Sequence, residues 1–242
     1  MTRSVEAFTE NARARDLHSL GLEAALGRKD YATAYQLFDE ATRALGVPLS
    51  QSLHSESSLK LQGARIIRDK GFTSLREALY GQDYGRLEEA HHSLVDSETM
   101  SAQMVQRGNE TYSPEAWRFL ISEHGATLGL LGRLATVCEV VQVPIEDVYE
   151  AEDYYDTAHK VFLSEGVNKY YQTSNAINAA RHERINGRLT AAGIWMGRAA
   201  LSVRQAKKHD PSNYEQARKT YTQRRAYLKS KRTAAASVLT KP

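Results

Sequence analysis

Cysteine and proline are scarce in this chain of 242 residues, and each scarcity excludes a class of structure. Because Cys138 is the only cysteine, no disulfide can form within the chain and no zinc site can use paired cysteines. Five prolines and fifteen glycines suit long helices better than sheets joined by tight turns. No stretch approaches the roughly 20 apolar residues that cross a bilayer, and the N-terminus lacks the apolar run of a secretory signal. We therefore expect a cytoplasmic protein that makes no use of a membrane.

Sequence motifs of common enzymes are also missing. The chain has no Gly-x-x-x-x-Gly-Lys phosphate loop, no Gly-x-Gly-x-x-Gly dinucleotide motif and no Gly-x-Ser-x-Gly nucleophile elbow. Cys138 lies among Val137, Val140 and Val141, a setting typical of an inert core thiol. We expect no catalytic residue, no metal or other cofactor and no enzymatic activity.

What the chain does contain is a strong asymmetry of charge. The formal net charge is +3, but residues 181–242 hold fifteen Lys and Arg against only Glu183, Asp210 and Glu215. The preceding 180 residues hold 17 basic and 26 acidic side chains. Such an asymmetry indicates either a basic interaction surface or a basic end that docks on an acidic one.

Apolar residues recur at steps of three and four along nearly the whole chain, a period that predicts helices and not strands. Gly46 predicts a left-handed helix cap, and Ser113 followed by Pro114 predicts a helix start. Lys70-Gly71 is interpreted as a turn between two helices. We expect nine or ten helices, at 4–27, 31–45, 54–69, 72–79, 86–107, 114–142, 145–163, 167–184, 188–208 and 211–232. The helix over 114–142 is the most apolar, so we expect it to be the most deeply buried.

One helix face occurs four times in the chain. Each copy has an aromatic residue, a small or apolar residue three positions on, and an apolar or aromatic residue seven positions on. The copies are Tyr31, Ala34 and Phe38; Phe72, Leu75 and Leu79; Tyr155, Ala158 and Phe162; and Tyr214, Ala217 and Tyr221. Steps of three and four place each set on one side of a helix, where it can pack against a neighbour.

With Leu20-Gly21 on the helix before it, the first copy resembles the tetratricopeptide repeat, in which a Leu-Gly helix faces an aromatic-and-alanine helix. The resemblance implies a right-handed stack of antiparallel helical hairpins. The copies depart from the family in spacing, because Tyr31 and Phe72 lie 41 residues apart where the family repeats every 34. For the later copies, the Leu-Gly candidates Leu131-Gly132 and Met196-Gly197 are displaced upstream. The expected fold is therefore all-α, either a tetratricopeptide-like α-solenoid or an irregular helical bundle, with one domain over 1–232 and a disordered tail at 233–242.

The resemblance also implies a function, since such arrays are non-enzymatic surfaces that bind a peptide or helix of a partner protein. An acidic, tyrosine-rich stretch is our candidate for the binding groove. Its residues are Tyr149, Asp153, Tyr154, Tyr155, Asp156, Tyr170 and Tyr171. The alternative is a solvated acidic face with half-buried tyrosines.

Two further hypotheses come from the residues themselves. A basic C-terminal region could bind nucleic acid or another polyanion, through Lys207, Lys208, Arg218, Arg224, Arg225, Lys229, Lys231 and Arg232. The alternative is an ordinary terminal helix whose cations complement its dipole. The third hypothesis is a di-metal enzyme, since Glu88-x-x-His91 and Asp156-x-x-His159 have helical spacing and Glu56 and Glu123 precede them.

Overall fold

The computed structural model describes residues 11–46, 57–81, 83–163 and 168–239, with side chains described as far as Ala226 and omitted for Ser57 and Ser58. Within these ranges the chain forms nine α-helices and no strand, which confirms the all-α class. The helices are α1 (Ala12–Leu22), α2 (Tyr31–Ala44), α3 (Ser57–Gly81), α4 (Arg86–Val105), α5 (Pro114–Val141), α6 (Ala151–Phe162), α7 (Lys169–Ile185), α8 (Leu189–His209) and α9 (Pro211–Leu239). A π-helical turn (Glu23–Arg28) extends α1, and a 3-10 turn (Asn109–Thr111) precedes α5.

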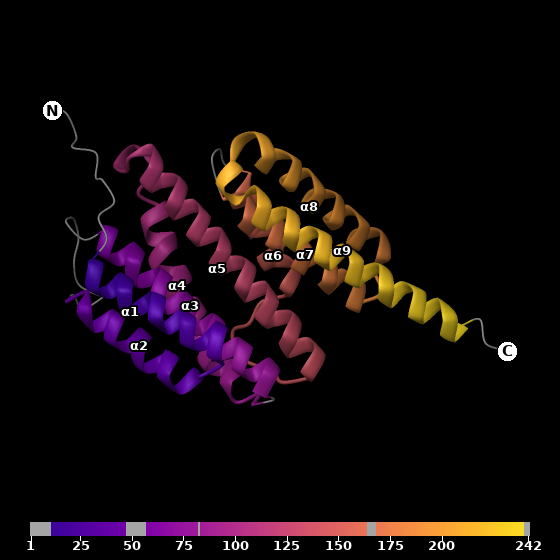
Figure 1. Cartoon of the computed structure of the whole chain (residues 1–242), viewed down its shortest axis with the longest axis horizontal. Helices are drawn as coiled ribbons and strands as arrows, with labels where there is room; N and C mark the ends of the chain where they lie inside the picture. The colour runs from indigo at the N-terminus through magenta and orange to yellow at the C-terminus, as the bar shows by residue number, and fades with distance from the viewer. Residues whose placement is uncertain (1–10, 47–56, 82, 164–167, 240–242) are drawn as a thin grey trace.

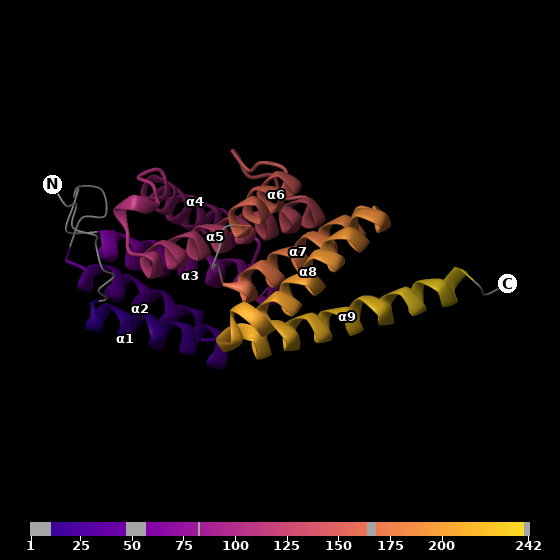
Figure 2. The same cartoon turned by 90° about the horizontal axis from the view of Figure 1, so that it is seen from above.

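Consecutive helices pack as antiparallel hairpins, α1 with α2, α3 with α4, α5 with α6 and α7 with α8. Each hairpin also contacts the next one, and α9 lies along both α7 and α8. Figure 1 shows α1 and α2 at one end of the molecule, α5 across its middle and the α7–α9 group at the other end. The C-terminal part of α9 extends beyond the other helices (Figure 2).

Several helix boundaries follow from local signals in the sequence. The hydroxyl of Ser113 accepts a hydrogen bond from the amide of Ala116 and so caps α5, with Pro114 in the first turn. The carboxylate of Asp30 caps α2 in the same way. Gly46 follows α2 with a φ of 69°, which confirms the predicted left-handed cap. Seventeen residues of α5 are buried, as its apolar composition predicted.

Aromatic rings packed on glycines join the helices of two hairpins. A Cβ at Gly21 would lie 2.7 Å from the ring of Phe38, so α1 and α2 approach through a glycine. A Cβ at Gly132 would lie 2.8 Å from Tyr155, and one at Gly125 would lie 2.7 Å from Phe162. These contacts join α5 and α6. The helix that carries Leu131-Gly132 therefore packs against the helix that carries Tyr155 and Phe162. That these hairpins are tetratricopeptide repeats stays a prediction.

The structure corrects three predicted boundaries. Lys70-Gly71 is not a turn, because α3 continues through it. A Cβ at Gly71 would lie 3.1 Å from the carbonyl oxygen of Ala90, so this glycine allows α4 to approach closely. The acidic helix begins at Ala151 and not at Ile145, since the preceding segment contains Asp147 in a left-handed conformation, with φ 62°. The last helix continues past Arg232 to Leu239.

Candidate functional site

The acidic, tyrosine-rich stretch is divided between the surface and the core. Tyr149 is 70% exposed, and Asp153 and Asp156 are also exposed. Tyr154 is buried, with its ring 5.9 Å from that of Tyr149. Tyr155 is only 1% exposed, so its placement in a binding groove is corrected: it packs against Gly132 in the core.

The second tyrosine pair also points partly inward. The rings of Tyr170 and Tyr171 lie 5.6 Å apart, and both side chains are half-buried. The hydroxyl of Tyr171 lies 3.5 Å from a carboxylate oxygen of Glu123, and the guanidinium of Arg68 lies 5.8 Å from its ring centre. Burial raises the pKa of Tyr171 to about 12. Tyr171 therefore belongs to an interior polar cluster, and the predicted groove residues do not form one continuous surface.

That interior cluster is a series of ionic contacts across α1, α3 and α5, and Tyr171 of α7 joins it through its hydroxyl and its ring. Nε2 of His18 lies 2.9 Å from Asp69, whose other oxygen accepts hydrogen bonds of 2.7 and 2.9 Å from Arg68. Arg68 also pairs with Glu123, the neighbour of Tyr171. Burial opposes the charge of Asp69, but Arg68 and the hydrogen bond from His18 outweigh it and lower the pKa to about 2.

Each charged group in this interior cluster has a partner of opposite charge or a hydrogen bond, as buried charges require. The cluster lies between helices, so its physical effect is to hold four helices in one relative position. Sequence reasoning found Glu123 only as a metal ligand and missed His18, Arg68 and Asp69. No local signal could have found them, since His18 and Asp69 lie 51 residues apart.

The proposed di-metal ligands are not brought together. Glu123 is engaged by Arg68, and Asp156 pairs with Arg198 at 3.7 Å. His159 lies edge-on to Trp195 at 5.4 Å. The other members are separate from these: His91 packs beside His92, and Glu56 lies outside the described residues.

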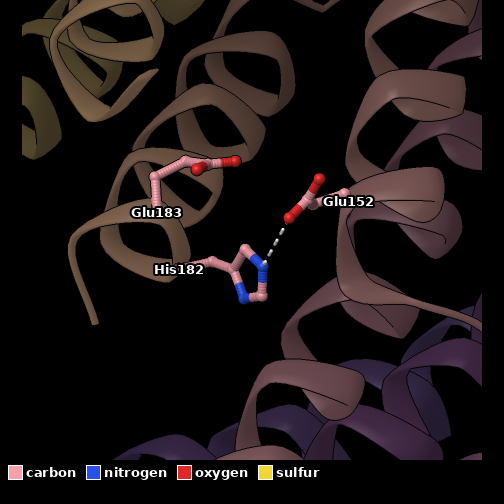
Figure 3. A group of neighbouring side chains, drawn as sticks. All are labelled: Glu152, His182 and Glu183. Carbon is pink, nitrogen blue, oxygen red and sulfur yellow. Dashed lines mark ion pairs between the residues drawn. The ribbon is translucent and has the colours of Figure 1, made fainter. Parts of the chain in front are cut away.

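A different group of possible ligands lies between α6 and α7. One ligand atom each of Glu152, His182 and Glu183 lies within 4.8 Å of the others in the described part of the chain. Figure 3 shows Glu152 reaching across from its own helix toward His182, with 3.7 Å between the carboxylate oxygen and Nε2. Arg188, in the turn before α8, donates to Glu183 at 2.6 Å and pairs with Glu152.

Arg188 occupies the position that a metal ion would need. A nitrogen of its guanidinium lies 3.1 Å from Nε2 of His182, and guanidinium nitrogens can only donate. Nε2 is then the acceptor, so the imidazole proton lies on Nδ1, which faces Thr136 at 3.2 Å and Glu139 at 3.5 Å. The cluster is therefore an ionic contact that holds the α7–α8 turn against α6, with its cation already in place.

Cys138 lies in the wall of a pocket between the end of α5 and residues 143–150. Its side chain is 8% exposed, and burial raises the pKa of the thiol to about 11. A thiol with this pKa carries little thiolate at neutral pH. The predicted burial of Cys138 is confirmed, and its lack of reactivity stays a prediction.

The outward face of α8 is apolar and has no partner in the described structure. Leu189, Ile194 and Leu201 are 68%, 58% and 54% exposed, and Gly193 and Gly197 lie between them. The opposite face packs inward through Trp195, Ala199, Ser202 and Ala206. Single exposed apolar residues are ordinary, but several of them on the outward side of one helix are typical of an interaction surface. Sequence reasoning missed this face because the same spacing also describes a buried helix.

The residues predicted to bind a polyanion do not form one cluster. Lys207 and Lys208 are exposed in the last turn of α8, and Arg224 and Arg225 are exposed more than three turns into α9. Arg218 is also exposed, but it pairs with Glu215 at 2.9 Å. The side chains of Lys229, Lys231 and Arg232 lie outside the described residues.

Arginines from three helices instead influence one another electrostatically, since Arg181 of α7 and Arg224 of α9 both act on the pKa of Arg133 of α5. Burial lowers the pKa of Arg133, Tyr155 and Tyr80 act in the opposite direction, and the positive charges of Arg181 and Arg224 contribute smaller decreases. Arg133 lies over the ring of Phe72 at 5.8 Å. In the described part of the chain, none of the three forms an ion pair with a carboxylate.

No protein-family model, curated protein or solved structure matches the chain. Among the described residues, no helix combines the length and the apolar character needed to span a membrane.

Proposed function

We propose that this chain is a non-catalytic, cytoplasmic scaffold that binds another protein through its stack of helical hairpins. One observation carries the proposal: α8 exposes Leu189, Ile194 and Leu201 on its outward side while its other face is already packed. The core of the molecule does not need these side chains. Their transfer from water to a partner surface would be favourable, since burying an aliphatic side chain contributes about 1.5–3 kcal/mol.

The experiment compares the outward face of α8 with another exposed part of the same protein. Full-length protein with Leu189→Ser, Ile194→Ser and Leu201→Ser serves as bait in native cell lysate beside the wild type. A matched control carries Val140→Ser and Leu163→Ser, which are also exposed but lie on other elements. The proposal expects a partner that the wild type and the control retain and the α8 variant loses. Retention by all three would refute the role of α8, and retention by none would refute the scaffold function.

Polyanion binding is a second candidate, and the arginines of three helices favour it. Arg133, Arg181 and Arg224 lack carboxylate partners among the described side chains, so an anion would relieve their mutual repulsion. Binding of a nucleic acid there would weaken steeply as salt is raised.

The test uses heparin and a single-stranded RNA as probes. Arg181→Glu with Arg224→Glu changes two exposed members and leaves Arg133 in place. We expect this variant to elute from heparin at lower salt than a control with Lys207→Glu and Lys208→Glu. Wild-type protein that shows no salt-sensitive retention would remove the second candidate.

A further inference from the structure

We propose that the outward face of α8 receives an amphipathic helix of a partner protein, with acidic residues of that helix over the basic end of α8. The basic end consists of Arg204, Lys207 and Lys208. This inference rests on the proposed scaffold function and names the kind of partner that the same surface fits.

Two glycines on this face have no role in the fold. A Cβ added at Gly193 or Gly197 would have nothing within 4 Å. By contrast, Gly21 and Gly132 are required because a ring lies under 3 Å from where their Cβ would be. Glycine inside a helix is less stable than alanine, so Gly193 and Gly197 weaken α8 without improving its internal packing.

The two glycines form the floor of a shallow apolar notch. At 100° per residue, Gly193 and Gly197 lie at the centre of the exposed arc of α8. Leu189 lies on one side of them, and Ile194 and Leu201 lie on the other. A helix backbone can approach closest where a facing helix has no side chain, while the flanking leucine and isoleucine side chains contact its apolar residues. The shape of the notch therefore fits a helix better than an extended peptide.

The positive charge at the C-terminal end of α8 indicates that the partner is acidic there. Between Leu189 and Val203 the outward arc carries no charge, because Arg198 turns aside to lie 4.2 Å from the ring of Trp195. Beyond Val203 the arc becomes basic through Arg204, Lys207 and Lys208, which are exposed. In the described part of the chain these three form no ion pair. An acidic segment placed there would gain attraction and faster association.

A second copy of this chain fits the face less well. In a parallel pair of α8 helices, the two basic ends would lie side by side, and like charges set against each other are unfavourable at an interface. In an antiparallel pair, the basic end of each would meet the N-terminal end of the other, where Glu152 and Glu183 are already paired with Arg188.

Site-specific cross-linking tests the inference in the full-length protein. A photoreactive phenylalanine analogue replaces Leu201 in one preparation and Tyr149 in another, and each is irradiated in native cell lysate. The cross-linked segment is then sequenced. We expect the Leu201 preparation to capture a segment that has helical apolar periodicity and Asp or Glu toward one end.

Each other outcome overturns part of the argument. Capture of a basic or non-helical segment, of this chain itself, or of lipid or nucleic acid at Leu201 would refute the proposed partner class. Capture of a protein at Tyr149 alone would refute the α8 site but leave the scaffold function standing. Capture at neither position would refute both.

A synthetic peptide of the captured segment then separates binding from stability. The double variant Gly193→Ala and Gly197→Ala should bind it at least about tenfold more weakly, because the methyl groups fill the notch. The same variant should melt at a higher temperature than the wild type, so misfolding cannot explain the loss. The matched control is Gly27→Ala, whose Cβ would also have space. Unchanged affinity of the double variant would refute the notch.

The charge of the basic end is tested with the same peptide. Reversing Arg204, Lys207 and Lys208 to Glu should weaken binding about tenfold or more at low salt and less at high salt. Reversing Lys160, which is exposed on α6, should have no effect. Equal affinity of the reversed and wild-type proteins would refute the acidic character of the partner.

Discussion

Replacing Gly132 by alanine should destabilise this protein, whereas the same replacement at Gly197 should stabilise it. The new methyl group at Gly132 would lie 2.8, 2.9 and 3.1 Å from three carbons of the Tyr155 ring. That ring cannot move aside freely, because it is 1% exposed and its hydroxyl lies 3.2 Å from the hydroxyl oxygen of Thr136. Overpacking of this kind costs about 1–3 kcal/mol.

The gain in helix propensity on replacing glycine by alanine is about 0.5–1 kcal/mol and offsets part of this cost. We therefore expect Gly132→Ala to lower the free energy of unfolding by about 0.5–2 kcal/mol. Gly197→Ala has the gain without the clash, since nothing lies within 4 Å of its new carbon. It should raise the free energy of unfolding by about 0.5–1 kcal/mol.

Urea unfolding followed by circular dichroism at equal protein concentration measures both changes. Unchanged slopes against urea would show that the same surface is exposed on unfolding in each variant. The melting temperatures should move in opposite directions, by about 2–4 °C per kcal/mol for a chain of this size. If Gly132→Ala were as stable as Gly197→Ala, the glycine–tyrosine contact could not be what joins α5 to α6.

Three other predictions concern the interior and the outward face of α8. Arg68→Met should lower the free energy of unfolding by about 3–5 kcal/mol in urea titrations, because Asp69 and Glu123 stay buried without their counter-charge; a loss below about 1 kcal/mol would contradict the ionic role. Burial lowers the pKa of His124 to about 4, whereas histidine in the unfolded chain titrates near its ordinary value of about 6.5. Between these values the unfolded chain binds a proton that the folded protein does not, so the free energy of unfolding falls as the pH falls from about 6.5 to 4. His124→Asn should therefore flatten the stability profile by about 1.4 kcal/mol per pH unit in that window, and parallel profiles would contradict this. Leu201→Lys should leave the free energy of unfolding within about 0.5 kcal/mol of the wild type in urea titrations, and a larger loss would show that Leu201 packs in the fold.

Short-range patterns in the sequence predicted the helices well. The cap at Ser113, the stop at Gly46 and the buried character of α5 all follow from residues within a few positions of each other. Gly71 shows where such patterns become ambiguous. A glycine between helical segments predicts a turn, but it also allows two helices to cross closely, and only the position of α4 decides between these.

The candidate site was harder to predict because its contacts join distant parts of the chain. Arg68 and Glu123 lie 55 residues apart, so no spacing rule connects them. Tyr155 is a different case. Its place in the third aromatic set already predicted a buried position, and the acidic residues around it suggested a groove. The helical period was the more reliable signal, since Asp153 and Asp156 lie on the exposed side of α6 while Tyr155 faces Gly132.

The cluster around Arg188 shows how an arginine can take the place of a metal ion. Glu152 and Glu183 both pair with its guanidinium, and the same group engages Nε2 of His182. Removal of this side chain would leave two carboxylates and a free imidazole nitrogen within 4.8 Å of one another. That set of donors suits Zn²⁺, which takes histidine nitrogen and carboxylate oxygen ligands.

We therefore expect Arg188→Ala to melt below the wild type in a chelating buffer and to regain thermal stability when Zn²⁺ is added. A ligand that binds only the folded state stabilises it by mass action, so the gain should grow with zinc concentration. The wild type should gain nothing, since its guanidinium already neutralises the carboxylates. Adding Glu152→Gln to the variant should abolish the zinc response, and this change is tolerable because Glu152 is half exposed. A zinc response in the wild type, or an undiminished one in the double variant, would show that zinc binds elsewhere and that Arg188 does not occupy a metal position.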